Sequence, residues 1–412
     1  MQYRFVSCSM RLIALLIVAL SASCFACAQA PAGQDLAVLD AKVYASPDAP
    51  PTSGTSILIQ HGKITAIGKN LAIPPGTPML SCSQCIVFAG FWNTHVHFME
   101  PKWNDVAHLP ASHLDEQIQQ MLTHSGFTTV VDTGSDTTNT IALRNRIESG
   151  ELPGPHIYTA GLPLYPPHAL PYYLKDLPPE LLAKLGQPAT PAEAAAFVEH
   201  NIAQGTDIVK LFTGSIVAPD HVVPMSIPIA HAAVETAHHH DQLVFAHPTN
   251  REGIRVAMES GVDVLAHAPD NVDGVDDAFL AQIVAHHMTM IPTLMLFSDE
   301  SDIAQIRAIV AKFHQLGGTL MFGTDTGFLS DYHLTKEYSQ LALAGLTFRD
   351  VLAMLTTAPA KRFGVDSHEG RIAPGMNGDL TILAVDPARG DTVAFTRVLY
   401  TIRSGKIIYR HP

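Results

Sequence analysis

The sequence predicts the α/β fold class: a (β/α)8 TIM barrel joined to a small β-sandwich domain that is built from both chain ends. Eight short apolar runs of strand type alternate with helical stretches in residues 89–370, and eight strands close such a barrel. Residues 31–88 and 371–412, at opposite ends, have strands and tight turns but no helix pattern. The chain of 412 residues, with 47% hydrophobic and 15% charged residues, is long enough for both domains and has a composition that argues against disorder.

Residues 1–30 are predicted to form a signal peptide. Arg4 and Arg11 are positive, an unbroken apolar stretch covers residues 12–20, and small residues follow. This stretch is too short to span a bilayer comfortably and no second one follows, so we expect a periplasmic or secreted protein with no integral membrane span. Residues 21–24, Ser-Ala-Ser-Cys, resemble a lipoprotein processing site, which leaves lipid attachment open.

The cysteines favour a disulfide in the mature chain. Cys8, Cys24 and Cys27 fall in the predicted signal peptide, which leaves Cys82 and Cys85. A structural zinc site would need two further ligands, and no other cysteine exists. In an oxidising compartment we expect this pair to staple a turn as a disulfide, with a pair of free thiols as the alternative.

The terminal domain is predicted from strand-like runs that tight turns separate. His61-Gly62 and Ser404-Gly405 each lie between two such runs and are typical of hairpins. The runs cover residues 36–44, 56–60, 63–67 and 79–88 near one end, and 379–385 and 398–409 near the other.

The eight barrel strands are predicted from apolar runs of similar length. The first ends at His97, and the others cover residues 126–132, 156–160, 207–212, 243–247, 262–267, 288–293 and 319–325. Helices are expected between them, for example over residues 191–200 after the capping residue Thr190, and over residues 229–240.

Metal-ligand residue types occur at the ends of five of these strands. In a (β/α)8 barrel the carboxyl ends of the strands meet at one mouth, where active sites lie. His95 and His97 are two apart on a strand, so both face the same side and can chelate one ion. The predicted metal ligands are His95, His97, Lys210, His247, His267 and Asp325.

Lys210 and Asp325 are predicted to be catalytic as well. An ordinary ammonium would repel a metal, so Lys210 fits this set if carbon dioxide has converted its amine to an anionic carbamate that bridges two ions. An ordinary lysine paired with a carboxylate at a one-metal site is the alternative. Asp325 would accept a proton from the activated water and pass it to the leaving nitrogen, the division of labour that metal-assisted hydrolysis requires.

Two long connections at the same face are expected to shape substrate preference. They cover residues 162–190 and 213–228. The candidate substrate contacts in them are His168, Tyr172, Tyr173 and His221. A rigid structural excursion is the alternative for both loops.

The chain resembles the amidohydrolase superfamily, in its prolidase-like and imidazolonepropionase-like branch that includes secreted ochratoxinase-type enzymes. The six predicted ligands carry the resemblance, together with residues 377–380, Asn-Gly-Asp-Leu, which match a closing family pattern. Residues 91–93, Phe-Trp-Asn, and 266–268, Ala-His-Ala, depart from the usual neighbours of the histidines; we expect them to line the pocket and to alter substrate preference. The resemblance implies two divalent metals: His95 and His97 on the more buried one, His247 and His267 on the other, and Lys210 as the carboxylated bridge.

The expected function is hydrolysis of an amide bond in a dipeptide or N-acyl amino acid. The same centre would support opening of a cyclic amide, or hydrolysis of a lactone or an organophosphate, and a silent periplasmic metal or solute binder is the alternative from another class. Zinc is the preferred metal, although manganese and cobalt suit the ligands and one ion or two can be held. A net charge of −13 disfavours nucleic acid as a partner. The sequence does not determine whether the protein is a monomer or a homo-oligomer.

Overall fold

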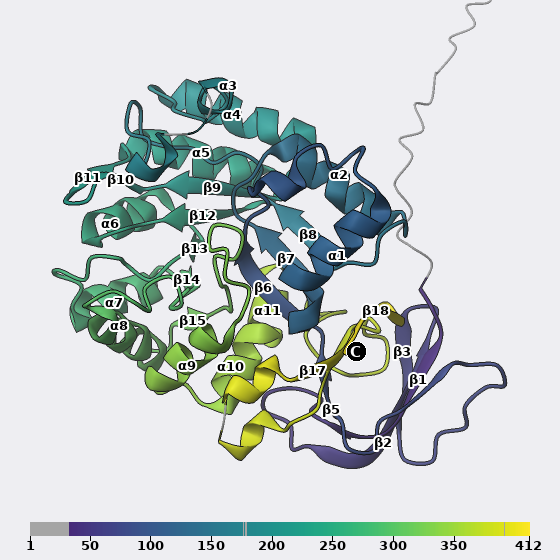
Figure 1. Ribbon diagram of the computed structural model, residues 1–412. Coiled ribbons are helices and arrows are strands. Elements are labelled where there is room, and N and C mark those ends of the chain that lie inside the picture. Colours follow the sequence, from purple (N-terminus) through teal and green to yellow (C-terminus); the bar gives the residue numbers. More distant parts are fainter. Residues whose placement is uncertain (1–32, 176, 178, 391) are drawn as a thin grey trace, which may run out of the picture.

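The computed structural model describes residues 33–175, 177, 179–390 and 392–412 (Figure 1). The predicted signal peptide, with Cys8, Cys24 and Cys27, lies outside these residues. Within them, no helix has the length and apolar character needed to cross a membrane.

The two chain ends form one eight-stranded sheet, seen in Figure 1 as purple strands beside yellow ones. Its order is β18-β17-β16-β5-β1-β2-β3, with β4 paired to β1. The antiparallel pair β16–β5 joins the ends, with Leu380 opposite Ala89. The predicted β-sandwich is not confirmed, because hydrogen bonds connect all eight strands into a single sheet. The strands are β1 (Leu36–Val43), β2 (Thr52–Gln60), β3 (Lys63–Gly68), β4 (Met79–Ser81), β5 (Ile86–Ala89), β16 (Leu380–Leu383), β17 (Val398–Arg403) and β18 (Lys406–Arg410).

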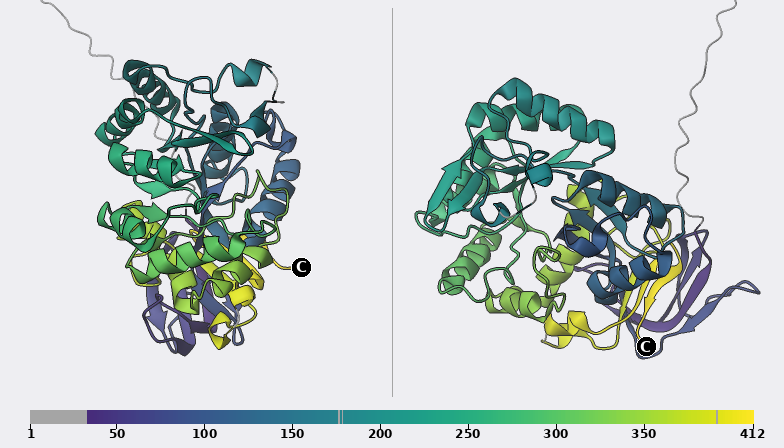
Figure 2. Two further views of the ribbon diagram at one scale, coloured as in Figure 1. Left: turned by 90° about the vertical axis from the view of Figure 1, so that its left-hand side faces the viewer. Right: turned by 45° about the horizontal axis from the view of Figure 1, so that its top comes forward.

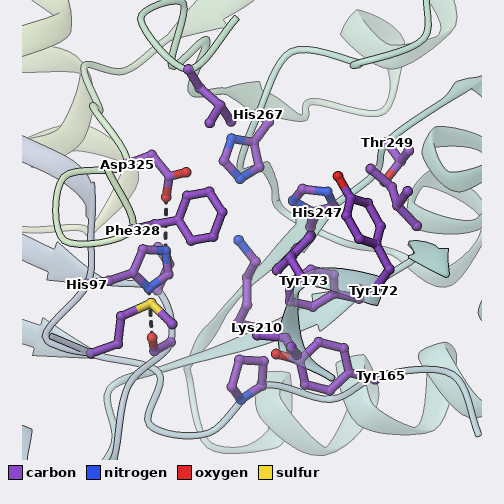
Figure 3. Close-up of a pocket in the computed structure, with 18 of the residues that line it drawn as sticks. His97, Tyr165, Tyr172, Tyr173, Lys210, His247, Thr249, His267, Asp325 and Phe328 are labelled. Atoms are coloured by element: carbon purple, nitrogen blue, oxygen red, sulfur yellow. Dashed lines mark hydrogen bonds and ion pairs between the residues drawn. The ribbon is translucent and has the colours of Figure 1, made fainter. Parts of the chain in front are cut away.

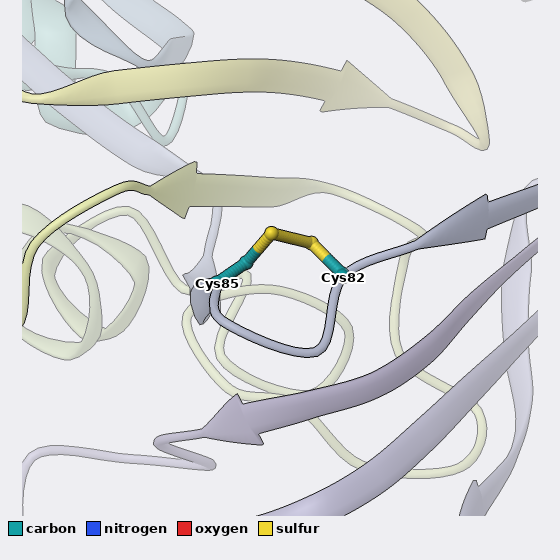
Figure 4. Close-up of a disulfide and its surroundings, with 2 residues drawn as sticks. All are labelled: Cys82 and Cys85. Carbon is teal, nitrogen blue, oxygen red and sulfur yellow. A yellow bond between two sulfur atoms is a disulfide. The ribbon is translucent and has the colours of Figure 1, made fainter.

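The predicted disulfide is confirmed and explains why one expected strand is two. Residues 79–88 read as one apolar run, but Cys82 and Cys85 are bonded and close a turn between β4 and β5 (Figure 4). Cys85 N donates to Cys82 O across this turn at 2.9 Å. Both cysteines are buried in the apolar core of the terminal sheet.

Each of the eight runs predicted for the barrel contains one strand, and all pairs are parallel. They form a three-stranded sheet, β6-β7-β8, and a five-stranded sheet, β15-β14-β13-β12-β9. Strands β13, β14 and β15 are short, because in each of them only two residues form regular strand pairing. The strands are β6 (Phe91–Val96), β7 (Phe127–Asp132), β8 (His156–Thr159), β9 (Ile208–Phe212), β12 (Leu243–His247), β13 (Val264–Leu265), β14 (Thr289–Met290) and β15 (Thr319–Leu320).

Backbone hydrogen bonds span both gaps between these two sheets. Thr94 N donates to Phe322 O at 2.8 Å, so β6 lies beside the segment that follows β15. Leu164 N donates to Lys210 O at 2.9 Å, which places the segment after β8 beside β9. Neither contact extends into a regular ladder, so the strands form two sheets and no closed barrel ladder in the described part of the chain.

Helices surround these strands, as the views in Figure 2 show. The helix predicted over residues 191–200 is confirmed as α4, which Thr190 caps by accepting a hydrogen bond from Glu193 N. The helix predicted over residues 229–240 is α5. The helices are α1 (Ala111–Met121), α2 (Thr137–Glu148), α3 (Pro179–Leu182), α4 (Pro191–Gln204), α5 (Ile227–His239), α6 (Arg251–Ser260), α7 (Asp277–Ala285), α8 (Ile303–Gln315), α9 (Thr335–Leu343), α10 (Phe348–Leu355) and α11 (Thr357–Arg362).

Shorter elements fill the long connections. A two-stranded hairpin follows β9, formed by β10 (Gly214–Ala218) and β11 (His221–Pro224). The 3-10 helices are η1 (Pro101–Trp103), η2 (Thr123–Ser125), η3 (Tyr172–Leu174), η4 (Pro387–Arg389) and η5 (Thr392–Thr396). The hairpin and η3 lie in the two connections that were predicted to shape the pocket.

An aromatic cluster fixes the terminal sheet against the strands that carry the site. Phe88 at the end of β5 and Phe91 at the start of β6 lie 5.8 Å apart between ring centroids. Phe395 lies 5.8 Å from Phe91, and Phe348 stacks on Phe395 at 5.8 Å. Aromatic pairs at such spacing add to the burial of apolar area, so β6 starts from a firmly held position.

Candidate metal centre

His95 and His97 lie on β6 with their rings held in one orientation. His95 Nδ1 is 2.6 Å from Ala266 O, and His97 Nδ1 is 2.7 Å from Gly134 O. A carbonyl oxygen only accepts, so Nδ1 carries a proton in both rings, and in the neutral form of each ring Nε2 presents a lone pair. Burial, the largest influence, lowers the pKa of His95 to about 4, so this imidazole is neutral at neutral pH.

Asp325 brings a carboxylate oxygen to the same point. Its Oδ1 is 3.1 Å from His95 Nε2 and 3.0 Å from His97 Nε2, while the two nitrogens are 3.3 Å apart. Burial acts to raise the Asp325 pKa, but the adjacent imidazoles hold it well below the ordinary value. Three ligand atoms, two imidazole nitrogens and one carboxylate oxygen, lie within 4.8 Å of one another. Because buried electron-rich atoms repel one another, a shared cation would stabilise them. This donor set therefore fits a divalent metal.

Two glycines explain how Asp325 reaches this position. Asp325 has the left-handed backbone angle φ +58°, and its N–H donates to His95 O at 2.9 Å. A Cβ at Gly323 would lie 2.3 Å from Ile291 Cγ2, and one at Gly327 would lie 1.9 Å from His97 O. Only glycine permits such close approach, so the Gly-Thr-Asp-Thr-Gly segment presses the carboxylate against β6.

Lys210 on β9 points its amine into the space that His97, His247 and His267 surround (Figure 3). The side chain is 2% exposed, and burial lowers its pKa to about 7. Within the described part of the chain the amine makes no hydrogen bond and no ion pair. A buried lysine without a carboxylate partner is unusual, because its charge is costly to bury.

His247 and His267 form a second pair beside the first. Their ring centroids are 4.6 Å apart, and His267 lies 4.4 Å from His95. Burial lowers both pKa values well below the ordinary one, so both rings are neutral at neutral pH. His247 Nε2 is buried and has no hydrogen-bond partner among the described residues. Because buried polar atoms normally have a partner, this nitrogen is suited to bind a metal.

Thr293 anchors His267 as the carbonyls anchor the first pair. Its hydroxyl donates to Pro292 O at 2.9 Å and lies 2.7 Å from His267 Nδ1. Since the hydroxyl proton is already used, the hydroxyl oxygen accepts from Nδ1–H and leaves Nε2 of His267 with a lone pair. Five of the six predicted ligands line one cavity, and the sixth, His95, is fully buried with its Nε2 3.1 Å from Asp325 Oδ1. Lys210, His247 and His267 do not join the tight cluster of the other three.

Asp132 supports the candidate centre and was not predicted from the sequence. Its carboxylate accepts from Ser135 Oγ and Thr159 Oγ1, both at 2.6 Å, and from Gly134 N at 3.2 Å. It thereby holds the turn whose Gly134 carbonyl orients His97. The signal in the sequence was a carboxylate at the end of the second barrel run, residues 126–132.

A cavity of about 1140 Å³ opens over the centre. Tyr172, Tyr173 and His221 line it, as predicted for substrate contacts. His168 is not among its lining residues, and this part of the prediction is wrong. His168 is exposed at a turn with φ +58°, because Ala169 N bonds back to Pro166 O and turns the chain away.

The unusual neighbours of the ligands do not line this cavity, contrary to expectation. Trp92 packs instead on Tyr158 and Phe363, with centroid distances of 5.7 and 5.3 Å. Asn93 donates to Thr324 Oγ1 at 2.8 Å. Trp92 is three positions before His95 and therefore faces the opposite side of β6, whereas Asn93 shares the side of His95 but is fully buried by its contact with Thr324. These neighbours of the ligands therefore do not contact the cavity.

Comparisons with known proteins found one family match and several similar folds. The amidohydrolase family profile matches residues 86–408. A solved Xaa-Pro dipeptidase with bound methionine has a TM-score of 0.77 and 23% identity over 92% of this chain and 100% of its own. A prolidase complexed with N-methylphosphonate-L-proline has a TM-score of 0.75 and 20% identity over 92% and 100%. For A. niger ochratoxinase the values are 0.73 and 18% over 92% and 96%. A search of curated proteins gave no significant match. At these identities the structural likeness concerns the fold.

Proposed function

Because the chain belongs to the amidohydrolase family, we propose that it is a binuclear metal-dependent hydrolase that cleaves the amide C–N bond of dipeptides or N-acyl amino acids. The observation that carries this proposal is the meeting of two oriented Nε2 lone pairs with the Asp325 carboxylate under a large cavity. The dipeptidase and prolidase among its structural neighbours supply the substrate class.

The residues divide between two divalent ions, for which zinc is preferred. His95, His97 and Asp325 would hold the first, and His247 and His267 the second. Bound metal supplies a Lewis acid that lowers the pKa of water towards 7 and polarises the scissile carbonyl. The neutral imidazoles and the ionised carboxylate are the protonation states that such binding needs.

Lys210 would complete both sites as a carbamate. Only the neutral amine attacks carbon dioxide, and the low pKa of this buried lysine provides that form at neutral pH. The amine nitrogen bonds to the carbon of carbon dioxide and loses one proton, which leaves an anionic carbamate with two oxygens. The absence of any carboxylate partner within the described residues supports this role.

Asp325 would move the proton of the reaction. It is ionised at neutral pH and stands against both oriented imidazoles, so it can accept the proton that a water loses as its oxygen bonds to the carbonyl carbon. The C–N bond then breaks, and Asp325 returns the proton to the departing nitrogen. No other group is required to balance this transfer.

The finer architecture and location belong to the same proposal. We infer that residues 89–370 form one (β/α)8 barrel, with the hydrogen bonds across both gaps as support. Residues 31–88 and 371–412 would be its β-sandwich. The Cys82–Cys85 disulfide supports export to the periplasm or beyond, since oxidising compartments preserve such bonds.

The test is an assay of metal-loaded protein against aminoacyl-prolines and N-acyl amino acids, with metal content measured by elemental analysis. We expect turnover with about two equivalents of metal, a loss of about 10³-fold in kcat for Asp325→Asn, and retention of most metal in that variant. Inertness at full metal content, or unchanged turnover of Asp325→Asn, would refute the proposal.

A further inference from the structure

The cavity wall beyond the metal centre is acidic and has few cations to balance it. Five carboxylate residues line it besides Asp325: Asp136, Asp220, Asp270, Glu300 and Asp302. Among the described lining residues there is no arginine, and the lysines are Lys184 and Lys210. Lys184 Nζ forms an ion pair with Asp136 Oδ2 at 3.4 Å. Lys210 belongs to the candidate metal centre.

Asp270 is the member of this wall closest in sequence to a predicted ligand, three residues after His267. Its Oδ1 is fully buried and has no hydrogen-bond partner among the described residues. Burial, with the charges of Asp325, Glu300 and Asp302, raises its pKa to about 7. No ion pair to Asp270, Glu300 or Asp302 occurs in the described part of the chain, so these three carboxylate residues of the wall have no counter-charge there.

The mouth of the same cavity carries exposed aromatic rings. Tyr172, Tyr173 and Phe328 are 45%, 37% and 44% exposed, high values for such side chains. Their rings touch in a row, with centroids 5.6 Å apart for Tyr172–Tyr173 and 5.4 Å for Tyr173–Phe328. Figure 3 shows Tyr173 and Phe328 reaching over the centre from different sides. Aromatic faces attract organic cations, so these rings and the nearby carboxylates would favour the same kind of ligand.

We propose that this cavity selects substrates with a positively charged ammonium or guanidinium group, which Asp270 holds with support from Glu300 and Asp302 while the aromatic rings cover its carbon chain. The inference rests on the proposed amide hydrolysis and refines it. A substrate carboxylate has no guanidinium to meet in this wall, whereas a substrate cation meets a carboxylate whose buried Oδ1 has no partner among the described residues. Selection by charge then comes from the loops after β13 and β14.

Matched substrates that differ by one charge test the proposal. Alanyl-lysine against alanyl-norleucine changes the charge on the amine side of the bond, and alanyl-leucine against propionyl-leucine changes it on the acyl side. In at least one pair we expect kcat/KM to favour the cationic member about 10- to 100-fold, the usual worth of a hydrogen-bonded charge. Asp270→Asn should reduce that ratio to nearly one, and Glu300→Gln should reduce it partly.

Asp299→Asn is the control, because it removes the same charge from an exposed neighbour that pairs with Lys336 and does not line the cavity. It should leave the ratio unchanged. The inference would be overturned if kcat/KM showed no preference for the cationic substrate in either pair. It would also be overturned if Asp270→Asn lowered kcat/KM equally for the cationic and the neutral substrate of a pair. Inertness towards all four compounds would instead count against amide hydrolysis. In that case the affinities of lysine and norleucine for the zinc-loaded protein, measured by calorimetry, test the selection of a cation independently of hydrolysis. Equal affinities would refute it.

Discussion

Replacing Thr293 by valine removes the one oxygen that orients His267 while keeping the shape of the side chain. Both residues are β-branched, so the left-handed backbone at this position, φ +47°, is equally strained in each. The variant leaves the buried His267 Nδ1–H without its acceptor at 2.7 Å. An unsatisfied buried donor costs about 1–3 kcal/mol, so the free energy of unfolding should fall by that amount.

The larger effect should be on metal binding. Without the hydroxyl, the His267 ring can rotate or change tautomer, and loss of such a supporting partner weakens metal affinity about 10- to 100-fold. We would measure this by titrating a competing chelator against the zinc-loaded protein and following the second equivalent of metal. The first equivalent, on His95, His97 and Asp325, should be released as in the unchanged protein.

Thr249→Val is the matched control for this experiment. Thr249 is also buried, also has a left-handed backbone angle of φ +60°, and also lines the cavity, but its hydroxyl donates to Gly214 O at 2.8 Å and not to a predicted ligand. It should lose stability without losing metal. If Thr293→Val keeps both equivalents of metal at the same chelator concentration as Thr249→Val, the assignment of His267 as a ligand fixed by Thr293 is wrong.

Three further predictions concern the rest of the molecule. Burial raises the pKa of Glu337 to about 8, so its contribution to stability is present below its unfolded pKa near 4.5 and is lost as the pH rises to about 8. Glu337→Gln should abolish that loss, on the order of 3 kcal/mol, in urea unfolding compared at about pH 5 and about pH 8.5; parallel pH profiles of the two proteins would contradict it. Replacing Cys82 and Cys85 together by serine should cost about 2 kcal/mol by loop entropy and leave metal content unchanged, and a loss of metal would show that the turn supports the site. Gly327→Ala places a Cβ 1.9 Å from His97 O and should cost about 2 kcal/mol or more as well as metal affinity. Gly345→Ala, at φ +83° with open space around it, measures the backbone cost alone, and equal effects of the two would argue against the clash.

Much of the site could be predicted because strand ends and ligand chemistry are local features. A period of two put His95 and His97 on one side, and parallel strands brought Lys210, His247 and Asp325 to the same mouth. The supporting groups could not be predicted in this way. Ala266 O, which orients His95, lies 171 residues away in the chain, and although Ala266 precedes the predicted ligand His267, the sequence does not show that its carbonyl meets His95.

The loops show the same limit. His168 and Tyr172 stand in one proline-rich connection and were equal candidates as substrate contacts, yet a turn exposes the first and η3 directs the second to the cavity. The departures around Trp92 misled for a different reason: Trp92 faces the opposite side of the strand, and Asn93 is buried against Thr324. Proximity along the chain is a poor guide to proximity in the pocket.

The sequence by itself determined which elements form, which residue types end them, and therefore that imidazoles, an amine and a carboxylate meet at one edge. These features depend on periodicity and on chemistry within a few residues. Only the tertiary structure decided which ring nitrogens are free, how closely Asp325 approaches β6, and that the wall above the centre is acidic and lacks arginine among its described residues. Those properties arise from hydrogen bonds and packing between segments far apart in the chain, and such contacts exist only once the chain is folded.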